Sequence, residues 1–396
     1  MRLCDVSEIF DCPHSTVPDE GEGYPLIRTP NVGKGRLILD NVHKVSKETY
    51  DIRNKRTVPH ENDIIFAREA PAGNAAVITK GQNVCLGQRT VLIRPNQSAV
   101  NPHYLVYYLL APQQQIKLLG YSHGATVGHV NIPDLAKLPI SLPTLALQKR
   151  IADIVENYDN LIEINNKRIK ALEQIAENLY KEWFVRFRFL GYENAEFENG
   201  IPKGWLRGRI DSYYDTTSGG TPSRKNKEFY NNGVIPWVKT GEIKDSIILD
   251  TEEHITEFAI NKSSAKILPK GCVIMAMYGV NIGMLSYLSK EMSCNQACCA
   301  FTDKRNLSSR HYLFHYMKSI RDYLLLIGFG AAQQNLSQDL IKRIRITMPS
   351  DEIVKLFEKR INDYYNQIYN LLKQNRNLIK QRDLLLPRLM SGKLEV

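Results

Sequence analysis

The sequence lacks any long apolar run. No stretch approaches the roughly 20 apolar residues that a membrane-spanning helix requires. The first residues, MRLCDVSEIFDCPH, have neither the basic segment nor the uninterrupted apolar core of a secretory signal. We therefore expect a cytoplasmic protein with no membrane partner.

Cysteine is also scarce, because the 396 residues include only seven. An odd number spread over a large chain does not suggest a disulfide framework and fits a reducing compartment. The one cluster, Cys294, Cys298 and Cys299, has no zinc-site spacing and lies in the apolar run CNQACCAF. His123 and His129 have no carboxylate or cysteine at a metal-binding spacing either. We predict buried strand thiols and no metal site.

Several motifs of common catalysts are missing as well. The chain has no GxxxxGKS/T phosphate loop. Pro133 and Asp134 resemble the start of a nuclease PD motif, but the acidic residue and lysine that should follow are missing. We interpret Asp134 as a turn or cap residue and predict no catalytic residues.

Positive charge is present in excess. Lys and Arg outnumber Asp and Glu by 52 to 42, which gives a formal net charge of +10. Such an excess favours polyanionic partners such as nucleic acid, although many proteins of other function are mildly basic. The length suits two domains with helical connectors.

An internal repeat with a period of about 205 to 211 residues organises the chain. In the clearest match YPLIRTPNV (24–32) aligns with IPWVKTGEI (235–243), which places Arg28 on Lys239. Three further matches follow in the same order: LGQRTVLI (86–93) with CNQACCAF (294–301), HYLVYYL (103–109) with HYLFHYM (311–317), and GATVGHVNI (124–132) with GAAQQNLS (330–337), with Gln88 on Gln296 and Asn131 on Asn335.

Each copy contains short β-like runs such as DIIFAR (63–68), punctuated by Gly, Pro and Asn turns, so we expect α+β domains. A duplicated domain in one chain imitates the two-fold symmetry of a DNA-binding dimer while letting each half read a different sequence. That arrangement favours a bipartite, asymmetric DNA site. The predicted boundaries are a first domain at 1–143, a long helix at 144–190, a second domain at 191–349, and a long helix with a tail at 350–396.

The two stretches predicted to form the long helices carry apolar residues at steps of three and four, which is typical of a heptad seam. Asn165 and Asn375 occupy matching seam positions, and a buried polar seam residue fixes register and partner, so we expect the helices to pair. About 35 helical residues span roughly 50 Å. Alternatively, each helix packs only on its own domain. The predicted pairing residues are Tyr158, Ile162, Asn165, Ile169, Leu172, Ile368, Leu371, Asn375 and Leu378, and Tyr364 is also assigned to the seam.

These features resemble the specificity (S) subunits of type I restriction-modification systems over essentially the whole chain. The segments that carry the resemblance are TSGGTPSR (217–224), IPWVKTGEI (235–243), NLSQDLIKRIRI (335–346), the helix at 147–185 and LLPRLMSGKLEV (385–396). In the first copy CPHSTVPDE (12–20) stands where the second has TSGGTPSR, so the glycine pair is missing there.

The resemblance implies two target-recognition domains, each reading one half of a split site, with the helices forming an antiparallel coiled coil that sets the spacing. It implies double-stranded DNA, two modification (methyltransferase) subunits and restriction (ATP-dependent translocase and nuclease) subunits as partners. S-adenosylmethionine, ATP and magnesium are then expected on those subunits, and no cofactor on this chain. Adenine methylation also needs a polar–Pro–Pro–aromatic loop, which the sequence lacks.

Two alternatives belong to other classes: a coiled-coil scaffold without DNA function, and a fused methylase and recognition protein. A scaffold does not need two sets of Gln- and Asn-bearing loops, and a fused enzyme needs a methylase segment.

Sequence-specific reading requires Arg, Lys, Asn or Gln side chains at base edges, with phosphate contacts in support. Glycine-rich turns are also plain turns, and Asn and Gln also cap turns, so each candidate has a structural alternative. The candidates lie at strand ends or in polar loops: Arg28, Thr29, Arg68, Gln88, His129 and Asn131 in the first copy, and Ser218, Gly219, Gly220, Thr221, Arg224, Lys239, Thr240, Tyr278, Asn281, Gln296, Gln333, Gln334 and Asn335 in the second.

Overall fold

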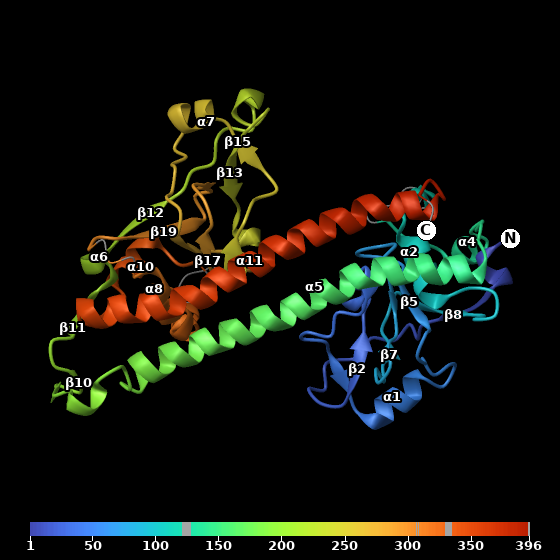
Figure 1. Ribbon diagram of the computed structural model, residues 1–396, viewed down its shortest axis with the longest axis horizontal. Coiled ribbons are helices and arrows are strands. Elements are labelled where there is room, and N and C mark those ends of the chain that lie inside the picture. Colours follow the sequence, from blue (N-terminus) through green and yellow to red (C-terminus); the bar gives the residue numbers. More distant parts are fainter. Residues whose placement is uncertain (121–127, 306, 308, 329–334, 395–396) are drawn as a thin grey trace. The chain divides into compact units, whose positions relative to one another are not determined.

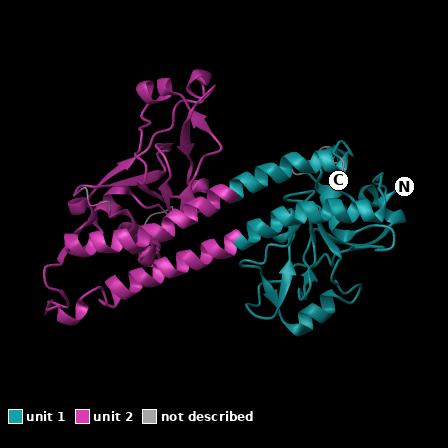
Figure 2. Ribbon diagram, in the orientation of Figure 1, with its two compact units in different colours: residues 1–164, 375–396 teal, residues 165–374 magenta. Residues whose placement is uncertain are grey.

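The computed structural model describes residues 1–120, 128–305, 307, 309–328 and 335–394. The chain divides into two compact units. The first unit comprises residues 1–164 and 375–396, and the second comprises residues 165–374 (Figure 2). Each unit combines sheets with helices, as the α+β prediction requires (Figure 1).

The first unit contains a five-stranded sheet and a smaller three-stranded sheet (Figure 1). The larger sheet has the order β1 (Ser7–Asp11), β8 (Thr90–Pro95), β5 (Ile64–Ala67), β6 (Ala75–Val77) and β3 (Gly35–Arg36). The smaller sheet has the order β4 (Lys44–Val45), β2 (Tyr24–Ile27) and β7 (Cys85–Leu86).

The second unit repeats this topology strand for strand. Its larger sheet has the order β12 (Tyr214–Ser218), β19 (Cys298–Asp303), β16 (Val273–Ala276), β17 (Leu285–Leu288) and β14 (Ser246–Ile248). Its smaller sheet has the order β15 (His254–Ile255), β13 (Ile235–Val238) and β18 (Ser293–Cys294). In both units the middle strand of the smaller sheet has one parallel partner, with Ile27 opposite Leu86 and Val238 opposite Cys294. The sequence repeat is therefore a structural duplication.

Side-chain alternation along the strands of each larger sheet divides its apolar side chains between two of the hydrophobic clusters of the unit. In the first unit Ile64 and Phe66 of β5 pack with helices α2 (Pro102–Leu110) and α5 (Leu145–Tyr180). Their neighbour Ile65 points to the other face and packs with Ile27 and Leu86 of the smaller sheet. The second unit has the same two layers. The cysteines of the apolar run CNQACCAF are buried, as predicted.

The short helices also correspond between the copies. The pairs are α1 (Lys47–Arg53) with α7 (Glu257–Lys262), α2 with α8 (Arg310–Ser319), α3 (Pro112–Gly120) with α9 (Arg321–Gly328), and α4 (Ile132–Ala136) with α10 (Gln338–Arg343).

One predicted correspondence, Asn131 with Asn335, is wrong by two residues. Buried Val130 donates its amide to Arg68 O at 3.0 Å, and buried Leu336 donates its amide to Met277 O at 2.8 Å. The equivalent of Val130 is therefore Leu336. Asn131 then corresponds to Ser337, because both are the N-cap residues of their helices, and His129 corresponds to Asn335. The alignment of the two copies is therefore determined by the buried apolar residue and by the N-cap position. The presence of an asparagine in both copies does not determine it.

Helices α5 and α11 (Asp351–Met390) pair within each unit. In the second unit Asn165 Nδ2 donates to Gln374 Oε1 at 3.2 Å, and the rings of Trp183 and Phe357 lie 5.8 Å apart. Residue numbers rise along one helix as they fall along the other, so the pairing is antiparallel and the predicted helix pairing is confirmed. Every predicted pairing residue is buried or half-buried. Over the described ranges, no helix is both long and apolar enough to cross a membrane.

Candidate nucleic-acid interface

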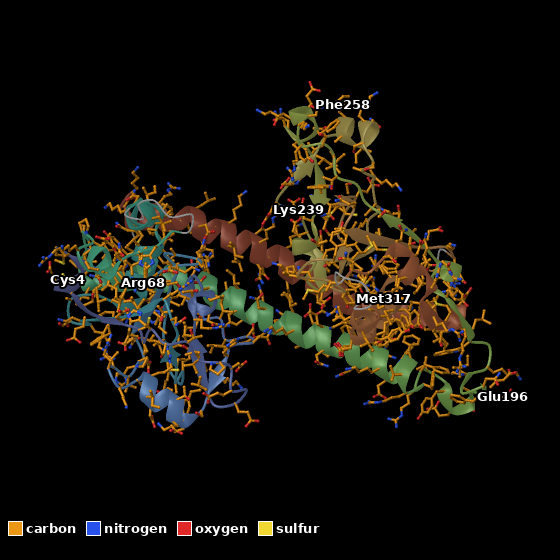
Figure 3. All side chains as sticks on the ribbon, turned by 180° about the vertical axis from the view of Figure 1, so that it is seen from behind. Cys4, Arg68, Glu196, Lys239, Phe258 and Met317 are labelled. Atoms are coloured by element: carbon orange, nitrogen blue, oxygen red, sulfur yellow. The ribbon has the colours of Figure 1, made fainter. Side chains whose placement is uncertain are left out.

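In the second copy the turn after β13 carries Lys239, which Figure 3 labels. Lys239 is the N-cap residue of the short 3-10 helix Thr240–Glu242 and is half-buried. Its Nζ lies 3.1 Å from Glu253 Oε1 and 3.2 Å from Glu252 Oε2. These hydrogen bonds raise the pKa of the Lys239 ammonium group. The two carboxylates therefore neutralise the positive charge of Lys239, a residue that the sequence predicts to contact DNA.

Arg224 shares the carboxylate of Glu253. Its NH2 lies 2.6 Å from Glu253 Oε2, and its guanidinium carbon lies 4.4 Å from the ring centre of Tyr230 and 5.4 Å from that of Trp237. Thr221 donates a hydrogen bond to Gln296 Oε1 in the same region. Arg224 and Lys239 thus share the carboxylate of Glu253, and Arg224 also packs on the ring of Trp237, whereas Thr221 and Gln296 bond to each other. The sequence did not indicate a role for Glu253 or Trp237 in the site.

The glycine pair of the second copy has a packing role. A Cβ atom on Gly219 would lie 2.0 Å from Cys294 O, and one on Gly220 would lie 2.4 Å from Ser264. Gly220 also donates its amide to Cys294 O at 2.9 Å, and Ser218 ends β12 just before the pair. The close backbone approach explains both glycines. A phosphate contact by this loop stays a prediction.

Asn281 holds the Lys239 turn in place. Its Nδ2 lies within donor distance of three carbonyls, those of Thr240 at 3.1 Å, Gly241 at 3.2 Å and Ile243 at 3.0 Å. Tyr278 packs half-buried against the core, whereas Asn335 is exposed. Gln333 and Gln334, like His123, lie outside the described residues.

The first copy has an equivalent turn. Arg28 is the N-cap residue of the 3-10 helix Thr29–Asn31, and Thr29 is buried, unlike the half-buried Thr240. Gly87 packs so closely on Arg28 that a Cβ atom there would lie 2.8 Å from its Cγ. The next residue, Gln88, donates its side-chain amide to His14 O. Arg28 thus packs on the residue that precedes Gln88, and Gln88 is followed in the chain by Arg89.

From Arg89 a chain of charged side chains runs inward, which we call the Arg89 cluster: Asp11, Arg68, Glu69, Arg89 and His129. Arg89 NH1 lies 3.0 Å from Glu69 Oε2, and Glu69 Oε1 lies 2.6 Å from His129 Nδ1. Arg68 NH2 donates to His129 Nε2 at 2.9 Å, and Arg68 NH1 lies 3.5 Å from Asp11 Oδ1. Arg68 also donates its Nε to Val130 O at 2.9 Å.

The hydrogen bonds define the tautomer of His129. A guanidinium group only donates, so Nε2 of His129 accepts from Arg68. Nδ1 then carries the proton and donates to Glu69. These contacts hold Arg68, Glu69 and His129 in fixed orientations. Asp11 Oδ1 is buried and makes no hydrogen bond to the described residues, although Arg68 NH1 lies 3.5 Å from it. Sequence analysis identified Arg68 and His129 but missed Asp11, Glu69 and Arg89.

The second copy carries no such charges at the same places. Arg68 and Met277 correspond, because their amides donate to Arg89 O and Ala297 O in the same way, which also matches Arg89 with Ala297. The equivalents of Asp11, Arg68, Glu69, Arg89 and His129 are Ser218, Met277, Tyr278, Ala297 and Asn335. The two copies thus have the same fold but carry different side chains at these equivalent positions.

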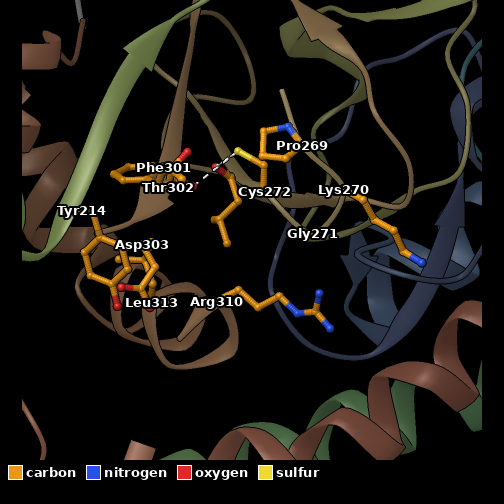
Figure 4. Close-up of a pocket in the computed structure, with 11 residues that line it drawn as sticks. Tyr214, Pro269, Lys270, Gly271, Cys272, Phe301, Thr302, Asp303, Arg310 and Leu313 are labelled. Carbon is orange, nitrogen blue, oxygen red and sulfur yellow. Dashed lines mark hydrogen bonds between the residues drawn. The ribbon is translucent and has the colours of Figure 1, made fainter. Parts of the chain in front are cut away.

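A pocket of the second unit is lined by Lys270, Cys272, Asp303 and Arg310, among others (Figure 4). Asp303 Oδ2 accepts from Ser309 Oγ at 2.6 Å, and Arg310 donates to Asn362 at 2.9 Å. Burial raises the pKa of the Cys272 thiol to about 12, and its Sγ lies 3.3 Å from Phe301 O. A protonated, hydrogen-bonded thiol is a poor nucleophile, so we assign no catalytic role to Cys272.

The fold and these surfaces define a tandem duplication of one α+β domain, whose copies share two paired helices and differ in their exposed polar side chains. The chain belongs to the family described as type I restriction modification DNA specificity domain, whose model matches residues 1–174 and 202–381.

Named relatives agree with this membership. The type I restriction enzyme MjaVIII specificity subunit of Methanocaldococcus jannaschii is 25% identical over 399 residues, which cover 97% of this chain and 89% of the relative. The type I restriction enzyme HindI specificity subunit of Haemophilus influenzae is 24% identical over 400 residues, which cover 84% of this chain and 87% of the relative. The crystal structure of an S subunit from M. genitalium has the same fold, with a TM-score of 0.58 at 14% identity over 98% of this chain and 95% of that one.

Proposed function

We propose that this chain is the DNA-recognition subunit of a type I restriction-modification complex, and that each copy reads one half of a bipartite, asymmetric site. One observation carries the proposal: the copies match strand for strand but differ in side chains at equivalent loop positions. Shared architecture favours the same mode of docking on DNA, and different side chains favour different base sequences.

The paired helices support a role in setting the spacing between the two half-sites. Helix α5 has 36 residues and α11 has 40, which corresponds to about 54 and 60 Å at 1.5 Å per residue. Successive major grooves on one face of DNA repeat about every 34 Å, so helices of this length suffice to bridge two of them. We further propose that the helices dock two modification subunits.

In this proposal the chemistry belongs to the partners. The modification subunits bind S-adenosylmethionine and methylate DNA, and the restriction subunits use ATP and magnesium. This chain contributes sequence recognition and no catalytic group, in the cytoplasm. The positive formal charge of +10 supports DNA binding through counterion release.

The test uses the chain assembled with its modification subunits and DNA that carries the methylated sequence. Binding is measured at physiological salt against DNA in which one half-site or the other is scrambled. The double variant Lys239→Ala, Thr240→Ala should lose about tenfold to a hundredfold in affinity through one half-site only, since a base contact is worth about 1–3 kcal/mol.

Lys203→Ala is the matched control, because Lys203 is also an ion-paired lysine of the second unit, 2.6 Å from Glu196. Equal loss at both half-sites would contradict independent reading. A wild-type complex without any sequence preference would favour the scaffold alternative.

A further inference from the structure

The Arg89 cluster is a place where the otherwise matched copies differ in charge. The first copy has Arg89 and Glu69, and the second has Ala297 and Tyr278 at the same strand ends. A purely structural ion-pair network is not needed by this fold, because the second copy builds the same sheet without these charges. The difference therefore points to a function specific to the first copy.

Arg89 is the most exposed side chain of the cluster. The side chain of Arg89 is 62% exposed, whereas that of Arg68 is 14% exposed. Glu69 and His129 connect the two arginines through contacts of 3.0, 2.6 and 2.9 Å. One accessible guanidinium is thus anchored by a chain of less exposed groups.

The backbone of Arg89 is also unusual. Its φ is +63°, in the left-handed region that side chains other than glycine rarely adopt. Ala297, its equivalent, is not among the described residues with positive φ. Such backbone geometry tends to persist where the surrounding structure fixes a functional side chain.

The chemistry of a fixed, exposed guanidinium next to a carboxylate suits one base. Arginine donates to guanine O6 and N7 in the major groove, which is the commonest specific contact between proteins and DNA. Anchoring by Glu69 reduces the entropy that a long side chain loses on binding. Gln88, another candidate of this copy, precedes Arg89 in the chain and donates its side-chain amide to His14 O.

We propose that Arg89 reads a guanine in the half-site of the first copy, and that Glu69, His129 and Arg68 position its guanidinium. This inference rests on the proposed function and adds the base and the residue. The second copy, with alanine at this position, reads its half-site with other side chains.

The experiment compares Arg89→Ala with wild type in the complex with modification subunits. Methylated positions are sequenced on a plasmid library with randomised half-sites, and affinity is measured at several salt concentrations. We expect Arg89→Ala to relax the requirement for guanine at one base pair of one half-site, with a tenfold to hundredfold loss on the original sequence. The other half-site stays unchanged.

Arg2→Ala is the matched control, because Arg2 is 61% exposed and lies 2.9 Å from Asp5 in the same unit. It should leave the sequence profile unchanged. Arginine and alanine both carry a Cβ atom, so Arg89→Ala adds no new strain at the positive φ, and equal unfolding midpoints of variant and wild type confirm that the fold is retained.

Glu69→Gln tests positioning: it should weaken discrimination at the same base pair without changing the salt dependence. Unchanged discrimination would exclude the positioning role. If Arg89→Ala weakens binding equally to all sequences, with a smaller salt dependence, Arg89 contacts phosphate and the proposal is wrong. An unchanged profile and affinity would make Arg89 a surface ion pair only. A wild-type complex that has no sequence preference contradicts the proposed function instead.

Discussion

At the residue scale, a buried ion pair joins the two long helices within the first unit. Arg382 NH1 lies 2.6 Å from Asp159 Oδ1, and Asp159, only 5% exposed, also accepts from Tyr107 OH at 2.6 Å. Burial raises the pKa of Tyr107, so its hydroxyl remains a donor. Asp159 is therefore satisfied from both helix and domain.

Replacing Arg382 by Met should destabilise the first unit by about 3–5 kcal/mol, because it leaves the Asp159 carboxylate buried without its counter-charge. Urea denaturation measures the change. The double variant Arg382→Met, Asp159→Asn should recover most of the loss. If the single and double variants are equally unstable, packing by the arginine matters more than its charge.

Two buried histidines of α8 predict how the stability of the second unit depends on pH. Burial lowers the pKa of His311, and it lowers the pKa of His315 to about 3. Below about pH 6.5 the unfolded chain therefore takes up protons that the folded chain does not. The stability contribution of His315 is complete above pH 6.5 and falls by about 1.4 kcal/mol per pH unit as the pH drops.

Denaturation midpoints between pH 7 and pH 5 check this expectation. His315→Gln should make the loss shallower, since His311 then acts alone. A variant with the same slope as wild type would mean that His315 is already protonated in the folded state.

Sequence reasoning reached the surface loops but not the contacts within them. The sequence indicates Arg68 and His129 as DNA-binding candidates in different loops, and the structure links them through a hydrogen bond. The sequence did not indicate Glu69 and Arg89 as site residues, because ion-pair partners from different strands come together only after folding. A signal was present: Arg89 follows Gln88, and the repeat places it opposite Ala297.

At the element scale, the repeat predicted most of the fold, because two copies of one pattern confirm each other. The sequence leaves two choices for the seam of α11 after Ile361. A step of three residues leads to Tyr364 and a step of four leads to Tyr365. In the structure Tyr365 is buried and Tyr364 is half-buried. Steps of three and four both keep a residue near the seam, so only packing decides between them.

The seam of α11 predicts a packing defect. Ile361 is fully buried in the core of the second unit, so Ile361→Ala should destabilise that unit by about 2–5 kcal/mol. Lys359→Ala, two residues away and exposed, should change stability by less than about 0.5 kcal/mol. Thermal unfolding of both variants measures the difference between a cavity in the core and a substitution on the exposed face. Similar shifts would argue against the seam.

At the scale of the whole molecule, the helices predict a change in spacer length. Inserting one heptad after Ile164 and another after Gln374 lengthens both helices by about 10 Å and keeps the heptad phase. Since DNA rises about 3.4 Å per base pair, the spacer in the preferred site should grow by about three base pairs. Sequencing of methylated sites measures it. An unchanged spacer with full affinity would exclude the helices as the ruler.

The proposed function also predicts that methyl transfer requires the modification subunits. Incubated alone with DNA and labelled S-adenosylmethionine, the chain should transfer no methyl groups, and adding modification subunits should restore transfer at the recognised site. Transfer by the purified chain alone would favour the fused-enzyme alternative.

The division of the chain has a consequence for its synthesis. The second unit is continuous, whereas the core of the first unit combines residues such as Ile151 and Val155 with Leu386 and Leu389. During translation the first copy emerges early, but the side chains that complete its core emerge last. The second unit is thus complete before the first, and the first copy waits for its partners until after the second has been synthesised.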